Sequence, residues 1–230
     1  MNGKQVLIVG GSAGIGLRLA HTLSDLGANV IIASRSADQL GESFNQPVRL
    51  ERLDASCEAS VSALFEALPT LDAIISTIKP SHVQGSFTDL HVEDARRAFD
   101  AKFWGQYYLA KYGATKVAKD GCIILTSGIA AVKAYSGFAS TAAINGAIES
   151  LVRSLALELS PIRVNAVSPG FVERFSNDAE RLASVAKLTT ARLPLGRLAC
   201  LQDIADAYVY LLNSRYTTGT VLTVDGGSTL

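Results

Sequence analysis

The chain has 230 residues, of which 48% are apolar and 18% charged, and this composition excludes a disordered chain because it can form one large core. Its 21 basic and 21 acidic side chains give a formal net charge of zero. That balance argues against a nucleic-acid or membrane-surface partner, because both require a basic field. Three widely spaced cysteines, the absence of a leader pattern and the absence of a long apolar run predict a reduced, cytoplasmic protein without a metal site.

Short apolar runs alternate with longer amphipathic runs along the whole chain. Strands are expected at 5–10, 29–34, 48–54, 72–77, 122–127, 162–168 and 220–226, and most are apolar on both faces, as in a buried parallel sheet. Helices are expected at about 14–26, 57–67, 92–117, 137–159 and 202–213. The alternation predicts an α/β fold with a doubly wound parallel sheet in a single domain, 1–230. The stretch 171–195 has no strand pattern and is predicted to form a helical lid over the substrate.

The turn after the first expected strand has the pattern of a phosphate-binding loop. Gly10, Gly14 and Gly16 lie in "VGGSAGIG", between that strand and the first helix. Small residues let the backbone approach a pyrophosphate, and the helix N-terminus offers free N–H groups and a positive dipole end. A plain tight turn would have similar glycines, but the position between a strand and a helix favours a nucleotide site.

The end of the second strand predicts which nucleotide is bound. NAD sites usually carry an acidic residue here for the ribose 2′-hydroxyl, whereas this chain has Ser34 and Arg35. A guanidinium pairs well with a 2′-phosphate, so the sequence favours NADP(H), although a solvated surface arginine is the alternative. Asp54 closes the third strand and is either a hydrogen-bond acceptor for the adenine or a cap of its own turn.

The chain as a whole resembles the short-chain dehydrogenase/reductase family. The matching features are "GGSAGIG", Asp54, "CIILTS" with Ser127, "RVNAVSPGFV", "PLGRL" and "VDGG", in the family's order over nearly the whole sequence. The resemblance implies a Rossmann-type sheet of seven strands with helices on both faces, a nicotinamide cofactor, and a homodimer or homotetramer built on the long helices. The positions that it assigns to the NADP(H) site are Gly10, Ser12, Gly14, Ile15, Gly16, Ser34, Arg35, Asp54, Pro169, Gly170 and Val172.

The active-site positions depart from the family's pattern. Lys102 stands where the family usually has an asparagine, and the family's tyrosine and lysine, four residues apart, align with Gly137 and Thr141. The Asn-Asn-Ala-Gly turn that follows the fourth strand in the family reads "STIK" here. The resemblance implies that the tyrosine exchanges the substrate's proton while the lysine lowers its pKa. An unassisted tyrosine has a pKa near 10, and here both members of the pair are absent from their expected places.

Three other residues are candidates for the catalytic work. Ser127 ends the fifth strand and would orient the substrate, or it caps its own loop. Lys102 would extend an ammonium into the space that the missing lysine leaves, and desolvation would make it an acid at neutral pH. Its alternative is a surface lysine lying over Phe103 or Trp104. Tyr135 lies in a loop about three residues shorter than is common in the family; it either turns inward or simply packs.

The residues lead first to an NADP(H)-dependent oxidoreductase that reduces a carbonyl or imine of a small organic molecule. Ser127 would orient the acceptor, and Lys102, with Tyr135 or water, would handle the proton. A second interpretation is a non-catalytic NADP-binding sensor or scaffold, because the nucleotide-binding positions are intact while the proton-transfer positions are altered. A third is a non-redox enzyme, such as a dehydratase or cyclase, that reuses the same cleft.

Overall fold

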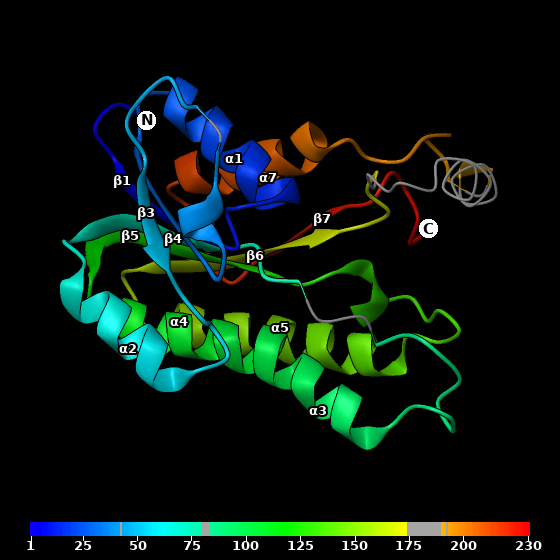
Figure 1. Ribbon diagram of the computed structural model, residues 1–230. Coiled ribbons are helices and arrows are strands. Elements are labelled where there is room, and N and C mark those ends of the chain that lie inside the picture. The colour runs from blue at the N-terminus through cyan, green and yellow to red at the C-terminus, as the bar shows by residue number, and fades with distance from the viewer. Residues whose placement is uncertain (42, 80–82, 174–189, 192) are drawn as a thin grey trace.

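A single parallel sheet organises the protein, whose computed structural model describes residues 1–41, 43–79, 83–173, 190–191 and 193–230 (Figure 1). The strands are β1 (Gln5–Val9), β2 (Asn29–Ser34), β3 (Arg49–Arg52), β4 (Leu71–Ser76), β5 (Val117–Thr126), β6 (Arg163–Pro169) and β7 (Val221–Val224). Their order is β3-β2-β1-β4-β5-β6-β7, and all pair in parallel. The predicted seven-stranded, doubly wound sheet is confirmed, with its change of direction between β1 and β4.

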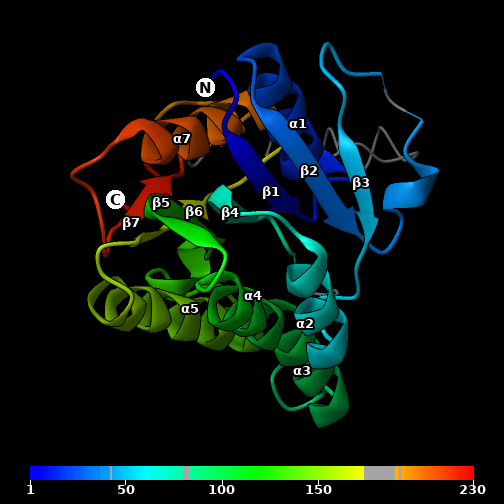
Figure 2. The same cartoon turned by 90° about the vertical axis from the view of Figure 1, so that its left-hand side faces the viewer.

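Helices cover both faces of this sheet (Figures 1 and 2). On one face lie α1 (Gly14–Asp25) and α7 (Leu201–Asn213), and on the other lie α2 (Glu58–Ala67), α3 (Val92–Phe99), α4 (Gly105–Gly113) and α5 (Ala139–Glu158). Neighbouring side chains of β1 point to opposite faces, so Val6 and Ile8 belong to the core under α1 and α7, whereas Leu7 and Val9 belong to the other core. This explains why the central strands are apolar on both faces.

The helix expected at 92–117 is divided and ends earlier. It contains a π-helical segment, η2 (Asp100–Trp104), between α3 and α4, and it stops at Gly113. A Cβ at Gly113 would lie 2.3 Å from Cδ1 of Ile74, so glycine lets the helix end pack directly on β4. Lys116 N then donates to Gly113 O and turns the chain into β5, which begins at Val117, five residues before the predicted strand.

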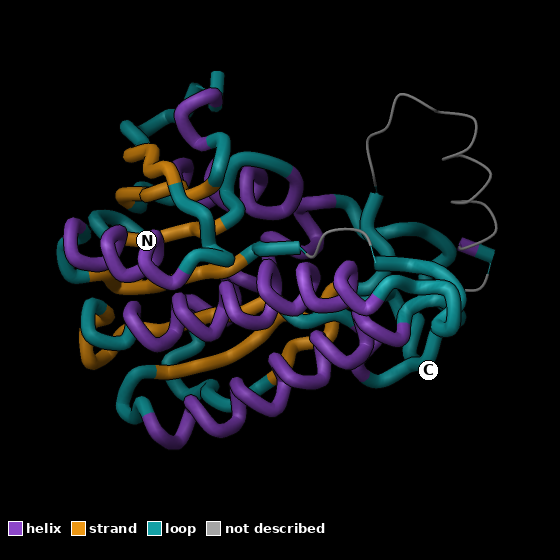
Figure 3. The backbone as a smooth tube through the Cα atoms, turned by 60° about the horizontal axis from the view of Figure 1, so that its bottom comes forward, coloured by secondary structure: helices purple, strands orange, loops and turns teal. Residues whose placement is uncertain are grey.

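Helix α5 also begins later than expected, at Ala139 rather than at 137. Gly137 has a φ of +81°, a left-handed conformation that cannot continue a helix and that glycine adopts without strain. Figure 3 shows the helices of this face lying side by side over the sheet.

The predicted lid falls largely outside the described residues, which exclude 174–189 and 192. At its start, Val172 forms an isolated parallel bridge with Ala199, supported by hydrogen bonds from Glu173 N to Ala199 O and from Ala199 N to Phe171 O, both 2.9 Å long. Within the described ranges, no helix combines the length and hydropathy that crossing a bilayer requires.

Candidate active site at the carboxyl edge of the sheet

The carboxyl ends of the central strands lie side by side, and the turns that leave them form the candidate site. Gly10 N donates to Ala33 O (2.9 Å), and Thr77 N donates to Val9 O (2.8 Å), which joins the turns after β1 and β4 to neighbouring strands. Ser127 N donates likewise to Val167 O (2.9 Å). In doubly wound sheets, ligands bind at this edge near the change of strand direction, here between β1 and β4.

The glycine turn after β1 is packed too tightly for larger residues. Gly10 and Gly14 have φ values of +86° and +54°. A Cβ at Gly16 would lie 2.4 Å from both Gly10 O and Thr77 Oγ1, so the start of α1 is pressed directly against the turns. The residue before α1, Ala13, provides no side-chain cap, and the first turn has no acidic residue. The uncapped N–H groups and the dipole end therefore fit an anionic pyrophosphate.

Arg35 follows β2 and lies beside this turn. It is exposed and makes no hydrogen bond or ion pair with any residue in the described ranges. The adjacent Ser34 Oγ accepts from Ser36 N (3.3 Å), and Ser36 Oγ lies 3.4 Å from Ser12 Oγ, so the end of β2 is next to the glycine turn. An unpaired guanidinium at this place fits the 2′-phosphate of NADP(H).

The remaining predicted cofactor positions are placed around the same edge. Asp54 Oδ1 accepts from Ser56 N (3.0 Å) and Ser56 Oγ (2.6 Å), so it caps its own turn, the alternative that the sequence left open. Pro169 ends β6, and a Cβ at Gly170 would lie 2.7 Å from Asp225 Cα. Ile15 and Val172 are half-buried and pack against the core beneath α1 and α7. Their contacts with a nucleotide stay predictions.

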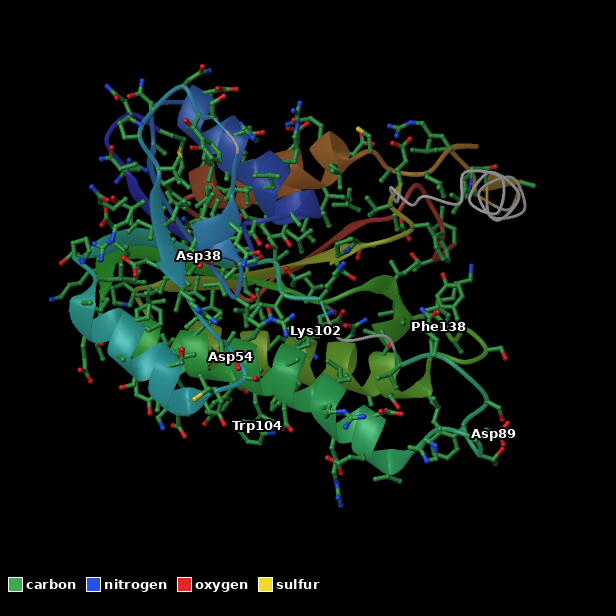
Figure 4. All side chains as sticks on the ribbon, in the orientation of Figure 1. Asp38, Asp54, Asp89, Lys102, Trp104 and Phe138 are labelled. Atoms are coloured by element: carbon green, nitrogen blue, oxygen red, sulfur yellow. The ribbon has the colours of Figure 1, made fainter. Side chains whose placement is uncertain are left out.

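Lys102 is buried at the centre of the site rather than lying on the helix surface. Its side chain emerges from the π-helical turn η2 between the sheet and α5, and the residue is 4% exposed (Figure 4). The Nζ atom donates to Ser127 O at 2.9 Å and to Asn145 Oδ1 at 2.7 Å. Single π-helical turns recur at functional sites, and this one brings an amine to the end of β5.

Burial changes the protonation of this amine. Removal from water lowers the pKa of Lys102 from 10.5 to about 7, because the charged form loses its hydration. The two oxygens that hold Nζ are uncharged, and no ion pair joins Lys102 to a carboxylate in the described part of the chain. Near neutral pH the amine can therefore both lose and gain a proton.

Asn145 was not singled out by the sequence, yet it is the residue of α5 that meets Lys102. Its Nδ2 donates to Gly128 O at 3.1 Å while its Oδ1 accepts from Lys102. Lysine can only donate and a carbonyl can only accept, so these partners determine the orientation of the amide. A Cβ at Gly128 would lie 2.9 Å from Asn145 Nδ2, so the glycine leaves room for it.

The Lys102 contact on α5 lies beyond the positions to which the resemblance assigns the family's pair. Gly137 lies before α5, where its carbonyl accepts from Gly85 N (3.1 Å), and it is not on the helix. The residue facing Lys102 is Asn145, four residues after Thr141. The contact with Lys102 is thus made one helical turn after Thr141, the position to which the resemblance assigns the family's lysine.

Ser127 is in the cluster, but its hydroxyl faces α5. Ser127 Oγ donates to Glu149 Oε1 at 2.8 Å and lies 3.3 Å from Asn145 O. Ser127 is 3% exposed, and Glu149 is 9% exposed. Asn145 and Glu149 are four residues apart and so share one face of α5, a spacing that could have identified them as partners of the strand end.

Tyr135 belongs to a different group of side chains. Its hydroxyl lies 3.0 Å from Ser228 Oγ. Its ring packs edge-on against the rings of Phe171 and Phe138, with centroid distances of 5.6 Å and 6.0 Å. Among the described residues it makes no hydrogen bond to Lys102 or Ser127. The structure thus brings two of the three predicted catalytic residues together and leaves the third apart.

Gln106 supports the π-helical turn that carries Lys102. Its Nε2 donates to Lys102 O and Thr126 O, both at 3.1 Å, and its Oε1 accepts from Thr126 N at 2.7 Å. Thr126 Oγ1 lies 2.5 Å from the hydroxyl of Tyr208, and burial raises the pKa of this tyrosine above its usual range. No cluster of metal-ligating side chains occurs in the described ranges.

Comparison with known proteins identifies the family. A family model described as enoyl-(acyl carrier protein) reductase matches residues 9–229. The short-chain dehydrogenase/reductase ucsE of an Acremonium species is 30% identical over 250 residues, covering 98% of this chain and 95% of that protein. The trans-4-hydroxycyclohexanecarboxylate dehydrogenase of Sinomonas cyclohexanicum is 31% identical over 247 residues, covering 98% and 93%.

Solved structures agree with the sequence relatives. A small-chain dehydrogenase in complex with NADPH superposes with a TM-score of 0.85 at 36% identity, over 99% of both chains. A second neighbour, described as a beta-ketoacyl-ACP reductase, has a TM-score of 0.87 at 30% identity, over 99% of this chain and 98% of that one. With its glycine turn, its sheet order and these matches over nearly its whole length, the chain belongs to the short-chain dehydrogenase/reductase family and is an oxidoreductase of that type.

Proposed function

We propose that the protein is an NADP(H)-dependent reductase that acts on a carbonyl or imine of a small organic molecule, with Lys102 as the proton donor. The observation that carries the proposal is the buried amine held by Ser127 O and Asn145 Oδ1 at the carboxyl end of β5. The cofactor would supply the hydride, while the chain binds, orients and moves the proton. A half-protonated amine near neutral pH suits general acid catalysis.

Each other residue of the site has a defined task in this proposal. The turn of Gly10, Gly14 and Gly16 would hold the pyrophosphate, and Arg35 the 2′-phosphate. Ser127 contributes through its carbonyl oxygen, which holds Lys102, because its hydroxyl is engaged with Glu149. A direct contact of the Ser127 hydroxyl with the substrate stays a prediction.

Cofactor choice tests the nucleotide half of the proposal. NADPH is expected to bind at least about tenfold more tightly than NADH, a difference of about 1.4 kcal/mol, because Arg35 can pair with the extra phosphate that NADH lacks. Arg35→Gln should reduce that preference, whereas the exposed Arg153→Gln on α5 should not change it. Titration calorimetry measures both; equal affinity for the two cofactors in the unmodified protein would reject the assignment.

A substrate screen tests the catalytic half. Purified protein with NADPH is mixed with a panel of ketones, aldehydes and imines, and cofactor oxidation is followed by absorbance. Consumption above the rate without protein supports a reductase. Tight NADPH binding without turnover would instead favour a non-catalytic NADP-binding sensor, an alternative supported by the separation of Tyr135 from the cluster.

The proposed assembly is a homodimer or homotetramer that uses the outer face of η2 and α4, where Trp104 and Tyr107 lie. Trp104 is 41% exposed and Tyr107 37% exposed, and their rings pack edge-on at 5.3 Å. Trp104 points away from the sheet (Figure 4). An exposed aromatic group of this kind is typical of an interface. Light scattering at micromolar concentration should give a dimer or tetramer that Trp104→Glu dissociates; a monomeric unmodified protein would exclude this assembly.

A further inference from the structure

A buried amine and a buried carboxylate are bonded to the same residue without pairing with each other. Lys102 Nζ donates to the carbonyl oxygen of Ser127 (2.9 Å), while Glu149 Oε1 accepts from the Ser127 hydroxyl (2.8 Å). Both charged residues are buried, at 4% and 9% exposure. The ion pairs formed by the described residues, with N–O distances up to 4.0 Å, do not include one between Lys102 and Glu149.

This arrangement is unusual in physical terms. Opposite charges in a protein interior normally pair, because each then recovers part of the hydration that burial removes. A direct pair would favour the charged ammonium and raise the pKa of the lysine. Lys102 instead meets uncharged oxygens, and burial is the cause that lowers its pKa to about 7. Desolvation therefore acts on an amine whose hydrogen-bond partners carry no opposing charge.

Asn145 occupies the position that makes the separation possible. Its amide is fixed at both ends, by the Gly128 carbonyl at 3.1 Å and by the Lys102 amine at 2.7 Å. Its backbone carbonyl oxygen also lies 3.3 Å from Ser127 Oγ. The same hydroxyl donates a hydrogen bond to the Glu149 carboxylate. Asn145 therefore presents its uncharged Oδ1 atom to the Lys102 amine. The carboxylate of Glu149, one helical turn later on α5, accepts from Ser127 Oγ instead.

We propose that Asn145 and Ser127 are positioning residues that hold the Lys102 amine on neutral oxygens, apart from the Glu149 carboxylate, so that it exchanges its proton at neutral pH. The proposal deepens the proposed function and rests on it for the use of that proton. The two residues have different roles. Asn145 Oδ1 accepts a hydrogen bond from the Lys102 amine. Ser127 accepts from the same amine through its backbone carbonyl and donates to the Glu149 carboxylate through its hydroxyl.

The other titratable groups around η2 are paired with one another, exposed, or linked to it through neutral side chains. Tyr208 of α7 is linked to this region through Thr126 and Gln106. On α3, Arg96 and Arg97 form ion pairs with Glu93 and Asp94 of the same helix. On α4, Lys111 pairs with Glu58 of α2, and in η2 itself Asp100 is exposed. Among the described residues Glu149 is the one buried carboxylate, and Ser127 links it to Lys102.

The test is a pH titration of Lys102 by NMR on the full chain with 13C-labelled lysine. The Lys102 signal is identified by its absence from Lys102→Met, and the unmodified protein should titrate near pH 7. Asn145→Asp should raise the midpoint by more than about one unit, because it puts a carboxylate where Oδ1 now lies, 2.7 Å from the amine. The exposed Ser154→Ala on α5 is the matched control and should leave the midpoint unchanged.

Two further variants test the separation itself and do not depend on the folding of Asn145→Asp. Glu149→Gln should move the Lys102 midpoint by less than about half a unit, because the carboxylate is held away from the amine. Ser127→Ala should raise the midpoint, because it releases Glu149 toward the amine, and Ser127→Ala/Glu149→Gln should cancel that rise.

Three results of these titrations would overturn the proposal. A fall of more than about one unit in Glu149→Gln would mean that the two groups are already coupled, and it would overturn the proposal. So would a Lys102 that stays charged to pH 9 in the unmodified protein, or an unchanged midpoint in a folded Asn145→Asp. None of these measurements uses NADPH or substrate, so their failure is distinct from a failure of the proposed reductase activity.

Discussion

Lys102→Ala is expected to lower NADPH-dependent turnover by about 10²-fold while changing NADPH affinity by less than about threefold. The substitution removes the amine that meets Ser127 O and Asn145 Oδ1, and it touches neither the glycine turn nor Arg35. In the unmodified protein, reductive turnover should fall as the pH rises through about 7, because the amine is then deprotonated and cannot give a proton. The variant should lose this pH dependence. Steady-state kinetics and calorimetry measure both effects.

Two comparisons guard against a trivial loss of structure. Lys102→Met keeps most of the side-chain volume, so it should remain folded and show the same loss of turnover as Lys102→Ala. The exposed Lys111→Ala on α4 should keep full activity. Full turnover in a folded Lys102→Ala would show that the proton comes from elsewhere, and Tyr135→Phe would then be the next variant.

Gly16→Ala is expected to weaken NADPH binding more than tenfold and to lower the free energy of unfolding by about 1–3 kcal/mol. The new Cβ would lie 2.4 Å from Gly10 O and from Thr77 Oγ1, and both belong to turns tied to the sheet. The start of α1 must therefore move away from the place where its N–H groups meet the pyrophosphate. Calorimetry with NADPH and denaturant unfolding measure the two effects.

Gly146→Ala on α5 is the matched control for that substitution. A Cβ there meets no atom within 4 Å, so the change should keep NADPH binding and add about 0.5–1 kcal/mol of stability from helix propensity. If Gly16→Ala bound NADPH as well as Gly146→Ala does, the glycine turn would not be the phosphate site.

Much of the fold was predictable because its signals are local. The apolar runs of β1, β2 and β4 identified buried parallel strands within one residue of their ends, and the glycine turn marked the start of α1 at Gly14. The end of α4 was missed because periodicity continues past Gly113, and only the close packing against Ile74 stops the helix there. The start of α5 was missed because the left-handed turn at Gly137 has no strong sequence signal.

The sequence by itself determined the fold class, the family, the glycine turn and the presence of Lys102 and Ser127 at the site, since each depends on residue type and on spacing along the chain. Only the tertiary structure decided that Asn145, rather than Thr141, meets Lys102, that Ser127 turns its hydroxyl to Glu149, and that Tyr135 lies apart. These contacts join segments 18 to 93 residues apart. Their geometry follows from how α5 and the π-helical turn η2 pack on β5, and hydrophobic patterns specify which face of a helix is buried but not which polar groups meet there.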